Sequence, residues 1–151
     1  MTNANEAKTA EELSLKLFVI LNRAQEAISK QVELDIKRYG LNLSEFGVLE
    51  LLYHKGDQPI QMIGKKVLLA SSSMTYVIDK LEKKELLERS ACPNDRRVTY
   101  GHLTEKGEAL MDDIFPQHEK AMASIFSSLN TDEKEQAISL LKKAGLAARD
   151  L

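Results

Sequence analysis

Short hydrogen-bonding side chains gather on one face of a helix predicted near the middle of this 151-residue chain. In the run from Leu69 to Ser90, apolar residues recur at i, i+3, i+4 and i+7, and the predicted buried stripe is Met74, Val77, Ile78 and Leu81. The opposite face carries short or stiff polar side chains, namely Ser72, Ser73, Thr75, Tyr76, Asp79 and Lys80. Such groups suit a helix that contacts base edges and phosphates in a DNA major groove. An ordinary surface helix with a serine-rich start is the alternative.

Ser71 is the expected N-cap of this helix, because a serine hydroxyl can accept a hydrogen bond from an amide of the first turn. The exposed amides behind it are also suited to binding a phosphate.

A basic, proline-containing segment follows this helix. The residues from Cys92 to Arg97 lie between two predicted strands, one starting at Leu86 and Leu87 and the other spanning Val98 to Leu103. Arginines at a hairpin tip can enter a narrow minor groove, where the negative potential favours guanidinium, and Asp95 can orient one of them. A helix-turn-helix followed by a basic hairpin is a winged helix. Two arginines on a solvated turn remain the alternative for the tip alone.

The charge of the chain is unevenly distributed. Its formal net charge is -2, although phosphate neutralisation supplies much of the affinity of a DNA-binding protein. Residues 60–107 hold nine Lys and Arg against six Asp and Glu, so this segment carries +3 and the remainder carries -5. A basic segment on an acidic body is typical of a DNA-binding module joined to a separate partner or dimer region.

Helical periodicity extends on both sides of this segment. The first twelve residues are polar and expected to be loose, and a helix of about seven turns is predicted from Leu13 to Ile36. Gly40 is its expected C-cap. Ser44 is the expected N-cap of a second helix, whose core face is Phe46, Leu49, Leu52 and Tyr53.

Shorter elements are predicted before the serine-rich helix. Residues 55–59 form a turn, Ile60 begins a very short strand that leans on the hairpin, and Gln61 to Leu68 form a helix with Ile63 and Val67 inward. Gly64 lies inside this helix at a cost of about 1 kcal/mol relative to alanine. A close packing contact is the expected reason.

Two further helices complete the chain. Thr104 is the expected cap of a helix that runs to Phe126, with a kink near Phe115 because Pro116 removes a backbone donor. The segment from Asn130 to Glu133 begins the last helix. Amphipathic helices at both chain ends, with little else to cover them, predict a helical dimer interface. A two-fold dimer would present two recognition helices to successive major grooves.

No catalytic or metal-binding pattern stands out in the sequence. His54, His102 and His118 lie in three different elements without a second ligand at helical spacing, so we interpret them as surface or boundary residues. An enzyme and a cofactor are therefore not expected. With one cysteine, no signal peptide and no apolar run long enough to span a bilayer, the protein is expected to stay in a reducing cytoplasm without contacting a membrane.

The resemblance to a known family rests on three motifs. These are Asp79 to Lys84 with Leu86 to Arg89, Asp95 to Arg97, and Leu103 to Gly107. They resemble the recognition helix and wing of the MarR family of bacterial transcriptional regulators, and the resemblance covers nearly the whole chain. Within the family, the chain looks most like the MhqR-type regulators, which are associated with quinones and related aromatics. Many members have Asp where Cys92 stands and Gly where Glu85 stands, which bears on the local wing and turn geometry.

The resemblance implies a mainly α fold with a small β-wing in a single domain, residues 1–151. A winged-helix lobe of about residues 44–103 would bind DNA, and helices of about 11–39 and 104–151 would dimerise. The expected function is that of a homodimeric repressor, bound to a pseudo-palindromic operator in a bacterial nucleoid and released by a small aromatic or quinone-like ligand. The expected DNA-binding residues are Ser71, Ser72, Ser73, Thr75, Tyr76, Lys80, Asn94, Asp95, Arg96 and Arg97.

The family usually binds its effector between the lobe and the dimer helices, which by resemblance directs attention to Phe18, Phe46, Tyr53, Phe115 and His118. Each of these is also a candidate for ordinary core packing. Two alternatives stay open. Cys92, close to Arg89, Arg96 and Arg97, could be a redox-sensing thiol, or simply a small, partly buried residue. The winged helix could also dock proteins and bind no DNA.

Overall fold

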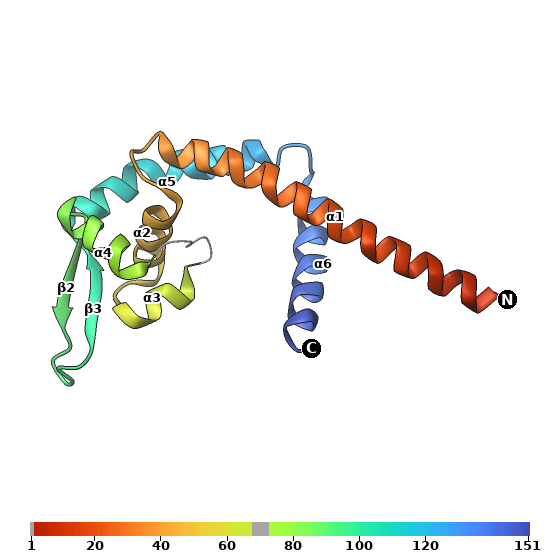
Figure 1. The fold of residues 1–151 in the computed structure, drawn as a ribbon. Helices are drawn as coiled ribbons and strands as arrows, with labels where there is room; N and C mark the ends of the chain where they lie inside the picture. The colour runs from red at the N-terminus through yellow and green to blue at the C-terminus, as the bar shows by residue number, and fades with distance from the viewer. Residues whose placement is uncertain (1, 68–72) are drawn as a thin grey trace.

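The computed structural model describes residues 2–67 and 73–151, and combines long and short helices with a few short strands (Figure 1). Within these residues the helices are α1 (Thr2–Lys37), α2 (Leu43–Lys55), α3 (Ile60–Lys66), α4 (Met74–Lys83), α5 (Glu105–Ile125) and α6 (Thr131–Arg149). The strands are β1 (Gln58–Pro59), β2 (Leu87–Ala91) and β3 (Thr99–Leu103). The prediction of a mainly helical fold with a small β-wing is confirmed.

Helix α1 is longer than predicted. It begins at Thr2, so the expectation of a loose first segment is wrong. Seven of the eleven residues from 2 to 12 are Ala, Glu or Lys, which are strong helix formers and favour extension of the helix to Thr2. The helix ends at Lys37, and the turn that follows is closed by a hydrogen bond from Gly40 N to Lys37 O, with Gly40 at a φ of 77°.

Asn42 caps helix α2, and the prediction of Ser44 as the cap is wrong. The Asn42 side chain accepts a hydrogen bond from Glu45 N at 2.8 Å, and Glu45 Oε1 accepts one from Asn42 N at 3.2 Å. This reciprocal capping box satisfies two backbone donors at once. Ser44 lies inside the first turn and is buried.

The three strands form one antiparallel sheet in the order β1-β3-β2. Strand β1 pairs Gln58 with Gly101 and Pro59 with Tyr100. The very short strand was expected to begin at Ile60, but Ile60 is the first residue of α3, and the pairing ends at Pro59. Ile60 instead directs its side chain at Gly101, where a Cβ would lie 3.0 Å from Ile60 Cδ1.

The core gathers the end of α1, helices α2 to α4, the first residues of the hairpin and the first half of α5. Its buried apolar members include Ile36, Phe46, Leu49, Ile63, Val77, Ile78, Leu81, Leu87, Met111 and Ile114. The predicted inward residues Ile63 and Val67 are buried. The close contact expected at Gly64 is also present, because a Cβ there would lie 2.9 Å from Met74 Cγ.

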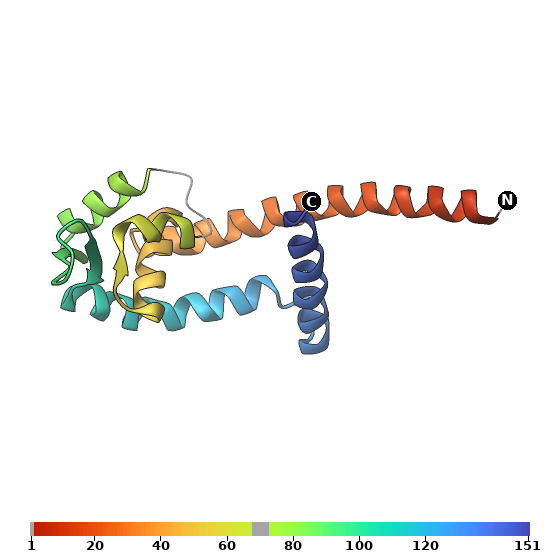
Figure 2. The same ribbon diagram turned by 90° about the horizontal axis from the view of Figure 1, so that it is seen from below.

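Helices α1 and α5 extend from this core, and α6 lies across the far end of α5 (Figure 2). Helix α5 is continuous through Pro116, and Thr104 caps it as predicted, accepting a hydrogen bond from Gly107 N at 3.0 Å. Helix α6 has the predicted capping box between Asn130 and Glu133 and no buried residue. Across the part of the chain that the structure describes, no helix is both long and apolar enough to cross a membrane.

Candidate nucleic-acid interface

Helix α4 presents a polar face to solvent and buries the opposite one. Val77, Ile78 and Leu81 are buried, and Met74 packs against the same core, so the predicted stripe is confirmed. Among the predicted DNA-binding residues, Ser73 and Thr75 are exposed, Tyr76 is 65% exposed and Lys80 is half-buried. The prediction of Ser71 as N-cap is wrong, because Ser73 occupies that position and makes no side-chain capping bond. Ser71 and Ser72 themselves lie outside the described residues.

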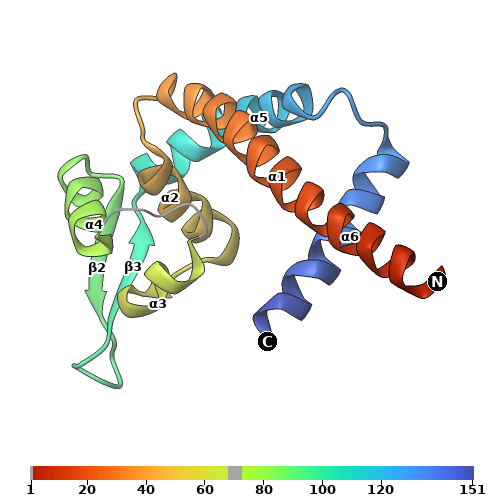
Figure 3. The same cartoon turned by 45° about the vertical axis from the view of Figure 1, so that its right-hand side comes forward.

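The tip of the β2–β3 hairpin projects away from α1 and α5 (Figure 3). Arg97 is 93% exposed at its side chain, and Arg96 and Asn94 are also exposed. Asp95 Oδ1 accepts hydrogen bonds from Arg97 N at 3.0 Å and from Arg97 Nε at 3.4 Å. The tip therefore holds one arginine against a carboxylate, as expected, and leaves its terminal nitrogens free to meet an anion.

Cys92 begins this tip and is half-buried. Its backbone N donates to Val98 O at 2.9 Å, which closes the base of the tip.

A left-handed residue turns the chain from α4 into the wing. Glu85 has a φ of 62°, a conformation that costs a residue with a Cβ about 1–2 kcal/mol. Its N donates to Glu82 O at 2.9 Å, and its O accepts from Thr104 Oγ1 at 2.6 Å. A glycine at this position, which the family resemblance led us to note, would adopt the same turn without strain.

Three ion pairs that sequence patterns did not reveal hold α4 in place. Lys84 Nζ, at the C-cap, contacts Glu45 Oε2 at 2.6 Å and Gly40 O at 3.3 Å, and Glu45 is 2% exposed. Arg89 on β2 contacts Asp79 and Glu82 of α4. The spacing of these residues in the sequence did not predict these ion pairs. The helix is thus tied to α2 on one side and to the wing on the other.

Four of the five predicted effector residues come together between α2 and α5. The ring centroid of Phe46 lies 4.6 Å from that of His118, Phe115 lies 6.0 Å from His118, and Tyr53 lies 5.9 Å from Phe115. His54, which was not predicted to belong here, joins the cluster at 4.6 Å from Phe115. We call these five residues the aromatic cluster.

Phe18 lies apart from the aromatic cluster. It is on α1, 66% exposed and seventeen residues before Asp35, which is about 25 Å along the helix axis.

Asp35 joins α1 to the aromatic cluster. Asp35 Oδ2 lies 2.8 Å from His118 Nδ1, and Oδ1 accepts from Tyr39 Oη and Arg38 Nη2, both at 2.7 Å. Burial by itself would raise the pKa of Asp35, but hydrogen bonds from His118, Tyr39 and Arg38 outweigh it and hold the pKa below its ordinary value. His118 is 8% exposed, so the interpretation of this histidine as a surface or boundary residue is wrong.

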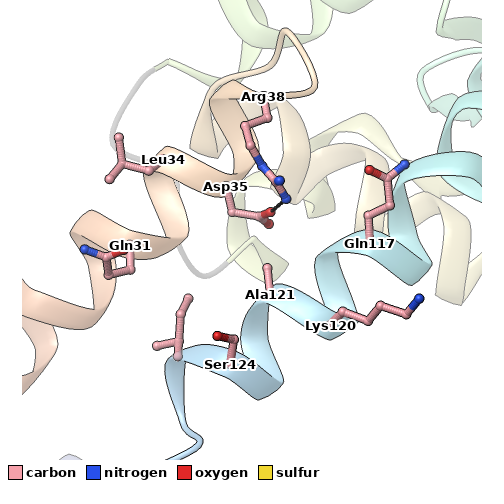
Figure 4. A pocket seen from close by; sticks show the side chains of 9 residues that line it. Gln31, Leu34, Asp35, Arg38, Gln117, Lys120, Ala121 and Ser124 are labelled. Atoms are coloured by element: carbon pink, nitrogen blue, oxygen red, sulfur yellow. Dashed lines mark hydrogen bonds and ion pairs between the residues drawn. The ribbon is translucent and has the colours of Figure 1, made fainter.

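A cleft of about 560 Å³ opens beside this network, between α1 and α5 (Figure 4). Its polar lining includes Asp35, Arg38, Gln117, Lys120 and Ser124. The described residues contain no group of three His, Cys, Asp or Glu side chains able to hold a metal ion.

Comparisons with known proteins agree with this geometry. The family model described as MarR matches residues 41–99. The HTH-type transcriptional regulator MhqR of Bacillus subtilis (strain 168) is 54% identical to this chain over 138 residues, covering 91% of this chain and 95% of that protein.

Two solved structures have the same fold. Bordetella bronchiseptica BpsR, whose structure concerns the regulation of its DNA binding by 6-hydroxynicotinic acid, is 28% identical with a TM-score of 0.75, covering 86% of this chain and 98% of that one. A mutant MarR from E. coli complexed with operator DNA is 20% identical with a TM-score of 0.75, covering 85% of this chain and 93% of that one.

Proposed function

This chain belongs to the MarR family of winged-helix transcriptional regulators, and we propose that it acts as a homodimeric repressor whose operator complex is released by a small aromatic or quinone-like ligand. Membership of the family makes it a DNA-binding regulator and not an enzyme, and disfavours the alternative of a docking module without DNA binding.

The observation that carries the DNA-binding mode is the pairing of two exposed elements on one lobe. Helix α4 exposes Thr75 and Tyr76 along a polar face, and the wing extends Arg96 and Arg97 on a narrow tip. We assign α4 to the major groove, where short polar groups contact base edges, and the wing arginines to the minor groove. The lobe that does this spans about residues 44–103.

Exposed apolar side chains support a homodimer. Between residues 13 and 21 of α1, seven large apolar side chains are 42–70% exposed: Leu13, Leu15, Leu17, Phe18, Val19, Ile20 and Leu21. Helix α6 exposes Ile138, Leu140 and Leu141 as well. An apolar cleft of about 400 Å³ lies between the end of α5 and α6 and is lined by Met122, Phe126, Ile138 and Leu141. Apolar patches of this kind mark association surfaces, so we propose that helices from both chain ends pair with those of a second copy.

The effector proposal rests on the aromatic cluster. The rings are tilted or edge-on to one another and gather apolar surface between α2 and α5, to which Tyr53 and His118 add polar groups. DNA binding by the related BpsR is regulated by 6-hydroxynicotinic acid, which is an aromatic acid. Because Phe18 stands far from the cluster within one chain, it can contribute only if a partner's α1 brings it there.

Binding to promoter DNA is the first test. Fluorescence anisotropy on DNA from the gene's own promoter should show tighter binding than random DNA of equal length, with log affinity falling linearly against log salt concentration. Arg97→Ala should weaken binding to both DNAs and reduce the salt slope by about 1, while Thr75→Ala should lose discrimination between them. Equal affinity for promoter and random DNA at moderate salt would refute the assignment of a sequence-specific repressor.

Release by ligands is the second test. Hydroquinones, benzoquinones and salicylate-like acids are titrated against the operator complex of the wild type and of Cys92→Ser. Reversible release in both proteins supports a non-covalent pocket, because a ligand acts through its different affinities for two conformations. Release of the wild type alone, reversed by added thiol, would reject the pocket and make Cys92 the sensor.

A further inference from the structure

The guanidinium of Arg89 links the recognition helix to the wing. Arg89 Nη2 lies 2.7 Å from Asp79 Oδ1, and Arg89 Nη1 contacts Glu82 Oε1. Asp79 and Glu82 are three residues apart on α4, whereas Arg89 lies on β2 in register with Gly101 of β3. One side chain of the wing thus holds two side chains of the helix.

This contact offsets one of two negative charges in the DNA-facing part of the lobe. Asp79 lies on the polar face of α4, three residues after Tyr76, and its side chain is 52% exposed. Unpaired carboxylates there would repel the phosphates that flank a major groove. Helix α4 carries Asp79 and Glu82 against Lys80 and Lys83, so its formal charge is zero, and Arg89 raises the charge of the ensemble to +1.

The contact also sets the placement of two DNA-binding elements relative to each other. Helix α4 has only ten residues, and Val77, Ile78 and Leu81 hold its buried side. These apolar contacts determine which side of the helix is buried, but they are non-directional and do not by themselves hold the helix at one exact rotation about its axis. An arginine that bridges two carboxylates is directional and fixes such rotation.

We infer that Arg89 is a positioning residue for operator binding, which pairs with Asp79 and Glu82 to orient α4 against the wing and offset part of their negative charge, instead of contacting a DNA phosphate. This inference rests on the proposed function. It adds a residue that is not among the predicted DNA-binding residues of α4 or of the wing tip. Two of the guanidinium nitrogens are already engaged by the carboxylates, and the side chain is 31% exposed.

A mutant cycle separates this role from a phosphate contact. Operator affinity is measured for the wild type, Arg89→Ala, the double variant Asp79→Asn with Glu82→Gln, and all three changes together, at temperatures well below thermal unfolding. Arg89→Ala should lower operator affinity by about tenfold or more in the wild-type background, and by no more than about twofold when the carboxylates are already neutral. Arg89→Lys, which can pair with one carboxylate at a time, should restore part of the affinity.

Arg149→Ala is the matched control, because Arg149 also pairs with an aspartate but lies at the end of α6, 73% exposed. It should leave operator affinity unchanged. The ratio of operator to random-DNA affinity should fall in Arg89→Ala, a change that loss of folding stability alone would not produce.

Two results would overturn the inference. An equal loss of operator affinity in both backgrounds would mean that Arg89 contacts a DNA phosphate directly. If Arg89→Ala binds the operator as tightly as the wild type does, the contact of Arg89 with Asp79 and Glu82 has no role in binding. A wild type that does not prefer its operator would instead refute the proposed function, and this inference with it.

Discussion

Gly107 is the position at which the smallest side-chain change should have a large effect on folding. A Cβ built on Gly107 would lie 2.2 Å from Leu86 O, far inside contact distance, and the obstructing atom belongs to the backbone. Leu86 O is itself held by a hydrogen bond from Thr104 N at 3.1 Å. The glycine therefore lets the first turn of α5 sit directly against the turn that connects α4 to β2.

The expected effect of Gly107→Ala is a net loss of stability. Alanine gains up to about 1 kcal/mol over glycine within a helix. Against this, forcing a methyl group into a packed site costs about 1–3 kcal/mol, and displacing Leu86 O weakens a hydrogen bond worth about 1 kcal/mol. The free energy of unfolding should fall by about 2 kcal/mol, which lowers the urea midpoint by about 1 M for a domain of this size.

Urea unfolding followed by circular dichroism measures this change. Protein concentration must be held constant, because dimerisation makes the apparent stability concentration-dependent. Lys106→Ala is the control on the same turn: the Lys106 side chain is 64% exposed, and its contact with Glu85 is 3.7 Å long, so its loss should change stability by less than about 0.5 kcal/mol. A midpoint for Gly107→Ala equal to or above that of the wild type would refute the steric argument.

Three further substitutions test the charged and strained positions. Because the pKa of Asp35 is lowered in the folded protein, its ionised form stabilises the fold above its ordinary pKa of 3.8, and this contribution is lost as the pH falls. Asp35→Asn should therefore flatten the decline in unfolding free energy measured by urea titration between about pH 5 and pH 3. Lys84→Ala leaves Glu45, 2% exposed, without its cation, and should lower the unfolding free energy by about 2 kcal/mol in the same assay. Glu85→Gly relieves the left-handed backbone and should raise the thermal midpoint, with a gain of about 0.5–1 kcal/mol; an unchanged or lower midpoint would contradict the strain.

Predictions from sequence succeeded where the residue types and their spacing allow only one structural interpretation. The stripe at Met74, Val77, Ile78 and Leu81 could be predicted because a helix with four apolar residues on one side has only that side to bury. The wing followed from a basic, proline-containing tip between two apolar runs. Helix α5 continues through Pro116, where a kink and not a stop was predicted. These inferences depend on local sequence alone.

The capping errors show where local sequence is ambiguous. Asn42 and Ser44 are both good N-cap residues, and each stands close to the start of α2. The choice is made by Glu45, which lies three residues after Asn42 and closes the capping box with it. Before α4, three consecutive serines make a single cap unpredictable, and the helix begins after the last of them.

The buried polar residues could not be found from periodicity, because their burial depends on partners far away in the chain. Asp35 and His118 are 83 residues apart, and Glu45 and Lys84 are 39 apart. A polar residue on a helix is assigned to solvent by default, since exposing it costs nothing while burying it unpaired costs several kcal/mol. That default fails when a second element delivers the matching group, as α5 does for Asp35 and the end of α4 does for Glu45. Both pairs tie α1 or the start of α2 to elements that we propose to bind DNA or to dimerise. The positions that sequence patterns missed therefore connect the two proposed parts of the fold.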